Sequence, residues 1–149
     1  MNTIDINELM KTLDAAGYQS CTELDSIRNE IGVEIPPSEL SGIIQVLLNH
    51  FDLFHLTTIT AQVRESDSDH IEVQYNFWKG KGLTLLTLVD RESPELQSIT
   101  DMIPGADFYE REVAEMFGVS FTGRIETRPL LLPDEWDLGP PMLPERDKS

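Results

Sequence analysis

The densest group of charged side chains in this sequence consists of Glu110, Arg111, Glu112 and Glu115. Paired carboxylates can serve as general acid and general base when their surroundings separate their pKa values. On an exposed helix face beside an arginine, however, both carboxylates should stay ionised, which is unfavourable for a general acid. Two interpretations therefore remain at this point. The cluster is a solvated, salt-bridged helix face, or it is an acidic surface that docks onto a basic partner.

Other catalytic or cofactor-binding patterns are missing from the sequence. No serine, cysteine or threonine lies in a nucleophile elbow, and no glycine-rich dinucleotide loop is present. Cys21 is the only cysteine, which excludes an internal disulfide and a cysteine-ligated iron–sulfur cluster. His50, His55 and His70 lack the spacing of metal ligands. We therefore expect no catalytic residue, no cofactor and no metal site in this chain.

The composition is strongly acidic. Among 149 residues, 27 are Asp or Glu and 11 are Lys or Arg, so the net charge is −16. Binding to nucleic acid or to anionic lipid requires clustered basic residues and is not expected, whereas a basic protein surface would be attracted. No apolar run is long enough to cross a membrane, and the first residues do not resemble a signal peptide. We expect a cytoplasmic protein that reaches a membrane only through partners.

A short helix over residues 107–117 is expected to position the acidic cluster. Pro104 and Gly105 interrupt the preceding element. Asp107 is the expected N-cap, with Glu110 completing a capping box. Gly118 is suited to the left-handed residue that ends a helix. Four apolar residues share one face of this helix and should be buried: Tyr109, Val113, Met116 and Phe117.

The remaining periodicities predict an α+β domain with helices mainly on one face of a mixed β-sheet. The expected helices cover residues 6–16, 40–49 and 94–103, and the expected strands cover residues 31–35, 54–63, 71–77 and 83–89. Residues 71–77 alternate between apolar and polar, so this strand should have one solvated face. Residues 83–89 are apolar on both faces and should form a covered, central strand.

The character of the chain changes after Gly123. Five of the nine prolines lie in residues 124–149, together with several large apolar residues that follow neither helical nor strand periodicity. An extended arm that leaves its own domain and lies on a partner would explain both features. The alternative is a tail folded back over its own sheet. We therefore divide the chain into a domain, residues 1–123, and a Pro-rich C-terminal docking arm, residues 124–149.

The segment Glu110–Gly123 resembles the signature of the 30-kDa subunit family, whose members are hydrophilic subunits of respiratory complex I and of related energy-converting [NiFe] hydrogenases. Three further blocks agree with that family in order and spacing, so that the likeness covers about residues 31–138: His55–Ala61, Ser98–Ala106 and Leu130–Trp136. The Leu130–Trp136 block resembles the hydrogenase branch more than the NADH-oxidising branch.

The resemblance implies a non-catalytic subunit of an oxidoreductase complex on the cytoplasmic side of the cell membrane. Such a subunit carries no redox centre, docks on the large subunit that holds the quinone or [NiFe] site, and helps to seat the neighbouring iron–sulfur subunit. The alternatives are the equivalent subunit of an oxidoreductase that passes electrons from NADH or another donor to quinone, and a stand-alone acidic interaction module. The expected partner-binding residues are Glu110, Arg111, Glu112, Glu115, Phe121, Arg128, Leu131 and Trp136.

Some positions depart from the family pattern. Arg124-Ile125 stands where the family commonly has His-Pro, and Arg128 stands alone where a pair of basic residues is usual. The motif with which sequences of the family commonly end is present here only in a reduced form, at residues 139–147. These departures fit a divergent hydrogenase-type branch, or a subunit whose partner has changed to match.

Overall fold

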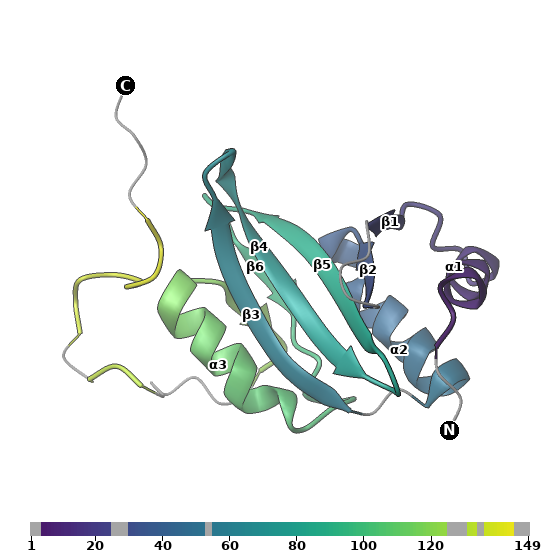
Figure 1. Ribbon diagram of the computed structural model, residues 1–149. Helices are drawn as coiled ribbons and strands as arrows, with labels where there is room; N and C mark the ends of the chain where they lie inside the picture. The colour runs from purple at the N-terminus through teal and green to yellow at the C-terminus, as the bar shows by residue number, and fades with distance from the viewer. Residues whose placement is uncertain (1–3, 25–29, 53–54, 125–130, 134–135, 145–149) are drawn as a thin grey trace.

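The computed structural model describes residues 4–24, 30–52, 55–124, 131–133 and 136–144 (Figure 1). The helices are α1 (Ile6–Ala15), α2 (Leu40–Phe51) and α3 (Ala106–Phe117), with a 3-10 turn at Pro37–Glu39 before α2. The strands are β1 (Thr22–Leu24), β2 (Ile31–Glu34), β3 (Leu56–Arg64), β4 (Asp67–Trp78), β5 (Gly82–Asp90), β6 (Glu95–Gln97) and β7 (Ser120–Thr122).

Five of the strands form a mixed sheet in the order β1-β2-β5-β4-β3. The long strands β3, β4 and β5 make an antiparallel meander, and β2 adds to β5 in parallel. Register places Tyr75 of β4 between Ile59 of β3 and Leu85 of β5. Strand β5 occupies the centre of the sheet, as its apolar character on both faces predicts.

One hydrophobic core joins the sheet to all three helices. In β4 the apolar residues of the expected alternation form the face that is turned to the core: Ile71, Val73, Tyr75 and Phe77 are all buried. The apolar stripe of α2 packs into the same core with Leu9 and Leu13 of α1. Helices α1 and α2 lie towards the β1–β2 side of the sheet, whereas α3 runs along β3 (Figure 1). The expected α+β class, with helices on one face of a mixed sheet, is confirmed.

The opposite face of β4 is less solvated than its alternation indicates. Glu72 is buried, and its carboxylate accepts hydrogen bonds from Gln62, Arg64 and Gln74. Side chains of β3 and β4 therefore enclose the carboxylate of Glu72, because cross-strand partners on one face lie within reach of each other. Trp78 at the end of the same face is exposed, as expected.

The helix expected over residues 94–103 is wrong. Residues 95–97 instead form β6, which pairs in parallel with β7 to make a separate two-stranded sheet. Leu96 lies opposite Phe121, and both are buried in the core. A tertiary pairing with a strand 25 residues further on therefore overrides the local Ser-Pro helix-start signal. The short strands β1 and β7 are likewise absent from the sequence-based prediction.

Candidate docking surface around helix α3

Helix α3 ends as expected but begins differently. Gly118 has φ +77° and its amide donates to the Ala114 carbonyl at 2.9 Å, so the left-handed C-cap is confirmed. The predicted capping box is wrong, because the helix starts at Ala106 after Gly105 and no side chain caps it. The expected apolar stripe is confirmed: Val113 and Phe117 are buried, while Tyr109 and Met116 are half-buried against the core.

Glu110 lies inside the molecule rather than on an exposed helix face. Its side chain is 0% exposed and its carboxylate accepts three hydrogen bonds. The donors are the Ser98 hydroxyl at 2.7 Å, the Ile99 amide at 2.8 Å and the Arg124 guanidinium at 3.0 Å. The expected exposure of Glu110 is therefore wrong, because the loop after β6 and the residue after β7 close over it. In this chain Glu110 is a structural residue.

Arg124 completes this buried cluster. Its side chain is only 7% exposed, and its second terminal nitrogen reaches an Asp107 carboxylate oxygen at 2.5 Å. Asp107 also lies 3.7 Å from the guanidinium of Arg111, one helical turn on. A buried charge is tolerated when it is paired and hydrogen-bonded. In the sequence Arg124 stands out only as a departure from a family pattern, and its role as the counterion of Glu110 becomes visible in the structure.

Tyr75 shares the electrostatic environment of this cluster. Burial raises the pKa of its phenol well above the ordinary value of 10, and the negative charge of Glu110 raises it further. Among the described residues the Tyr75 hydroxyl has no hydrogen-bond partner. The phenol therefore stays protonated at neutral pH. Glu110 is fully buried and its carboxylate accepts three hydrogen bonds, so the cluster holds the fold together.

Glu115 makes a different kind of contact. One of its carboxylate oxygens accepts the Leu131 amide at 2.7 Å and the Leu132 amide at 3.2 Å. One residue along α3, the Met116 carbonyl accepts the Met142 amide at 2.8 Å. The described part of the arm, residues 131–133 and 136–144, is thus attached to the C-terminal half of α3 at two places.

The sequence-predicted anchors fall into three groups. Leu131 and Trp136 are exposed on the arm, and the Trp136 indole donates to the Gly139 carbonyl at 2.7 Å. Phe121 is buried opposite Leu96, so its expected role as a surface anchor is wrong, because β7 uses it to close the core. Arg128 lies outside the described residues. Leu138, which was not among the expected anchors, is 78% exposed.

A groove of about 350 Å³ lies between β3, α3 and the arm. It is lined by Thr60, Ala61, Glu112, Val113, Met116, Phe117, Leu131 and Met142. Glu112 is half-buried there, and within the described residues its carboxylate makes no hydrogen bond or ion pair. The structure therefore separates two carboxylates that are adjacent in the predicted acidic cluster. Glu110 is satisfied inside, and Glu112 faces an apolar groove.

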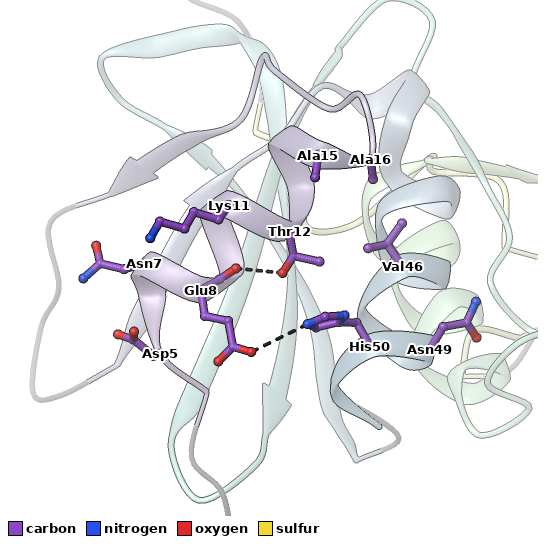
Figure 2. Close-up of a pocket in the computed structure, with 10 residues that line it drawn as sticks. All are labelled: Asp5, Asn7, Glu8, Lys11, Thr12, Ala15, Ala16, Val46, Asn49 and His50. Carbon is purple, nitrogen blue, oxygen red and sulfur yellow. Dashed lines mark hydrogen bonds and ion pairs between the residues drawn. The ribbon is translucent and has the colours of Figure 1, made fainter.

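A larger cleft than this groove lies elsewhere, between α1 and α2 (Figure 2). It has a volume of about 740 Å³, and Glu8 of α1 faces His50 of α2 across it at 3.6 Å. Small apolar residues, including Ala15, Ala16 and Val46, are part of its lining. Among the described residues that line this cleft, no nucleophile is paired with a base. In the described parts of the chain, no group of three or more His, Cys, Asp or Glu could hold a metal ion.

The fold resembles two solved structures. A chain of the membrane-bound sulfane sulfur reductase (MBS), an archaeal respiratory membrane complex, superposes with a TM-score of 0.66 at 20% identity, covering 91% of this chain and 78% of that one. The trypsin-resistant fragment (1–134) of Nqo5 also gives a TM-score of 0.66, at 22% identity, covering 79% of this chain and 98% of the fragment. None of the helices in the described ranges is long and apolar enough to span a bilayer.

Sequence comparison gives the family. An NADH-quinone oxidoreductase subunit of Salinispora tropica is 31% identical over 116 residues, which are 74% of this chain but 47% of that protein. The corresponding Roseiflexus castenholzii protein is 25% identical over 139 residues, and this alignment covers 90% of this chain and 80% of that protein. A subunit of the F(420)H(2) dehydrogenase of Methanosarcina mazei is 28% identical over 125 residues, 74% of this chain and 78% of its own. The chain thus spans about half the length of the Salinispora relative.

The model of one family matches residues 33–147, and the match includes the second half of β2, all of α2 and α3, β3 to β7 and the described arm. The chain therefore belongs to the family described as respiratory-chain NADH dehydrogenase, 30 Kd subunit.

Proposed function

We propose that this chain is a non-catalytic peripheral subunit of a complex I-like, membrane-bound oxidoreductase. In this role it docks on the large subunit, which holds the quinone or [NiFe] site, and helps to seat the adjacent iron–sulfur subunit. The observation that carries the proposal is the arm along α3, which keeps Leu131, Trp136 and Leu138 exposed although hydrogen bonds to α3 and to Arg91 hold it in place. Exposed aromatic and aliphatic side chains on an ordered segment are typical of protein interfaces.

The finer assignment that we propose is an energy-converting [NiFe] hydrogenase. It is supported by the Leu130–Trp136 block, which resembles the hydrogenase branch of the family. The names of the relatives favour a second candidate, because they are subunits of NADH-quinone oxidoreductases and of an F(420)H(2) dehydrogenase. The second candidate is therefore the equivalent subunit of an enzyme that delivers electrons from NADH or another donor to quinone.

Affinity purification from membranes tests the proposal. The full chain, tagged at its N-terminus, is expressed in the organism from which it comes. The membranes of these cells are then solubilised with a mild detergent. We expect the tag to recover a large subunit and iron–sulfur subunits in equal amounts, with iron–sulfur signals in the electron paramagnetic resonance spectrum. Accessibility of the tag to protease in inverted but not in right-side-out vesicles would place it on the cytoplasmic side. Recovery of the chain alone from the soluble fraction would support the stand-alone module instead.

The recovered complex also distinguishes the two electron-transfer assignments. Hydrogen evolution from reduced ferredoxin is expected for the hydrogenase type, without reduction of a quinone by NADH. Quinone reduction by NADH or by reduced F420, without hydrogen evolution, would overturn the hydrogenase assignment while leaving the role of a docking subunit intact.

A further inference from the structure

We propose that the groove between β3, α3 and the arm receives a basic side chain, an arginine or lysine presented by an apolar segment of the partner subunit. This inference rests on the proposed docking function and names the chemistry of what docks. Its basis is the coincidence of three features in one place: apolar walls, one carboxylate without a counterion among the described residues, and an arm that completes the walls.

The shape of the groove suits a long side chain. Ala61 of β3 and Val113 and Phe117 of α3 make apolar walls, and Met116 adds a flexible thioether. The volume of about 350 Å³ exceeds that of one side chain and leaves room for its neighbours. Arginine and lysine bury their methylene stems against apolar surface while their charged ends reach a polar group. A groove with apolar walls and one charge at the side fits that amphipathic shape.

The charge of the groove selects a cation. Among the described residues of the lining Glu112 alone is ionisable, and its carboxylate has no hydrogen-bonding or ionic partner within the described chain. Glu110, two residues earlier, accepts three hydrogen bonds and needs nothing more. A half-buried carboxylate beside apolar walls is unfavourable unless it is paired. A cation from the partner would supply that pair, and the net charge of −16 would attract basic surfaces in general.

The arm is part of the receptor. Leu131 and Met142 form the wall that the domain itself does not provide. Their backbone amides are held by the Glu115 carboxylate and the Met116 carbonyl, respectively. The attachments of the arm therefore shape the groove before any partner arrives. Such preorganisation lowers the ordering cost of binding.

Dissociation of the purified complex tests the inference. The tagged full chain and its variants are immobilised with the bound large subunit, and the rate at which the large subunit leaves is measured at increasing KCl. Removing one member of a buried charge pair at an interface acts mostly by speeding dissociation. We expect Glu112→Gln to speed dissociation by a factor of about 30 or more, and Glu112→Arg to prevent stable recovery. Glu23→Gln, an exposed carboxylate on β1 at the opposite edge of the sheet, is the matched control and should leave the rate unchanged.

A second variant keeps the test decisive if the Glu112 variants do not fold. Thr60→Lys places a cation at an exposed position in the groove lining and leaves Glu112 in place. We expect this lysine to compete with the basic side chain of the partner and to weaken recovery of the large subunit. Unchanged dissociation with a folded Glu112→Gln, or with Thr60→Lys where the Glu112 variants are unfolded, would overturn the inference.

Cross-linking identifies the occupant. A photoreactive benzoylphenylalanine at Leu131, on the groove wall, should attach to a peptide of the large subunit that contains an arginine or lysine next to apolar residues. A cross-linked peptide without a basic residue would contradict the inference. If the unmodified chain retains no partner at all, the proposed function fails first. If it retains the partner but the groove variants behave like the control, only the groove inference fails.

Discussion

The two halves of helix α3 use the same residue type in opposite ways. In the N-terminal half, Glu110 is sealed inside the molecule and accepts donors from Ser98, Ile99 and Arg124. In the C-terminal half, Glu115 is half-buried and holds the backbone of the arm. Glutamates five residues apart point to different sides of a helix, since each residue turns the direction by about 100°. The side of α3 on which each carboxylate lies, and the segment that covers that side, therefore decide its role. Glu110 stabilises the fold, whereas Glu115 shapes a surface.

The contacts of Glu110 and those of Glu115 should also differ in what they stabilise, the domain in the first case and the position of the arm in the second. The cluster around Glu110 ties the loop after β6 to α3 and to the residue after β7, so its loss should unfold the domain. The contacts of Glu115 hold only the Leu131–Leu132 part of the arm, whereas Met116 and Arg91 hold residues 142–144. Loss of the Glu115 contacts should therefore loosen that part of the arm and leave the domain folded. Four variants or pairs of variants test this division, beginning with the largest expected effect.

Arg124→Met should cause the largest loss of stability. The substitution leaves the carboxylate of Glu110 buried without its counterion, and breaking a buried pair costs about 3–5 kcal/mol. The free energy of unfolding of the full chain in urea measures the loss. In the double variant Glu110→Gln with Arg124→Met, the amide oxygen can still accept from Ser98 and Ile99 without a buried charge, so we expect a smaller loss than in the single variant. A loss below about 1 kcal/mol for Arg124→Met would contradict the structural role of the cluster.

Gly118→Ala should cost less, about 1–2 kcal/mol. The backbone at Gly118 has φ +77°, which strains any residue with a Cβ by about 1 kcal/mol. The new Cβ would also lie 2.9 Å from Cγ of Pro140, so that the arm must shift. Thermal unfolding measures the cost. Gly105→Ala at the other end of α3 is the control, because φ is −64° and the space is open there, and it should be neutral or slightly stabilising.

Glu115→Gln should act on the arm alone. A hydrogen bond to a charged acceptor is stronger than one to a neutral acceptor. The substitution should therefore weaken the attachment of the arm to α3 by about 1 kcal/mol, which makes local opening of the arm roughly fivefold more frequent. Hydrogen exchange followed by NMR should therefore show faster exchange of the Leu131 and Leu132 amides, with global stability changed by less than about 0.5 kcal/mol. Glu112→Gln should leave both amides unaffected. A global loss of stability in Glu115→Gln would show that the two halves of α3 are not independent.

Periodicity in the sequence predicts the elements whose apolar pattern matches one buried face. The meander β3–β5, helix α2 and the stripe of α3 follow directly from such patterns. Strand β6 is mistaken for a helix because Ser93-Pro94 is a good local helix start, whereas the strand depends on pairing with β7. Pairing between short, distant segments leaves little periodicity for sequence analysis to detect.

The candidate site is predictable in position but not in detail. The spacing of Glu110, Glu112 and Glu115 places an acidic group on α3, yet nothing local distinguishes the buried carboxylate from the others. That distinction depends on Arg124, fourteen residues away, and on the Ile99 amide, eleven residues away. Long-range hydrogen bonds of this kind arise only when the chain has folded. A single unexpected basic residue after the signature is nevertheless a signal that could have suggested a counterion.

The smallest effect is expected for a solvent-accessible ion pair in the β3–β4 hairpin, where the side chains of His70 and Asp67 are 44% and 35% exposed. The hydrogen bond of His70 Nδ1 to Asp67, at 3.0 Å, raises the pKa of the imidazole above its usual 6.5 and lowers the pKa of the carboxyl. The nearby charges of Asp90 and Asp69 raise the histidine pKa further. The raised pKa contributes stability below pH 6.5 that is lost as the pH rises through the folded value, and the lowered pKa of Asp67 contributes stability that is lost in acid.

An NMR titration of the His70 ring protons should give a pKa above 6.5, and Asp67→Asn should return it towards that value. Because both side chains are open to solvent, the unfolding free energy of the full chain should hardly change between about pH 6 and 8 on account of this pair. If the Asp67→Asn variant instead lost as much stability as Arg124→Met, exposure could not be what separates the two kinds of ion pair. The different roles of the two halves of α3 would then need another explanation. They are argued from the same principle, namely that a buried ion pair contributes more to the free energy of unfolding than an exposed one.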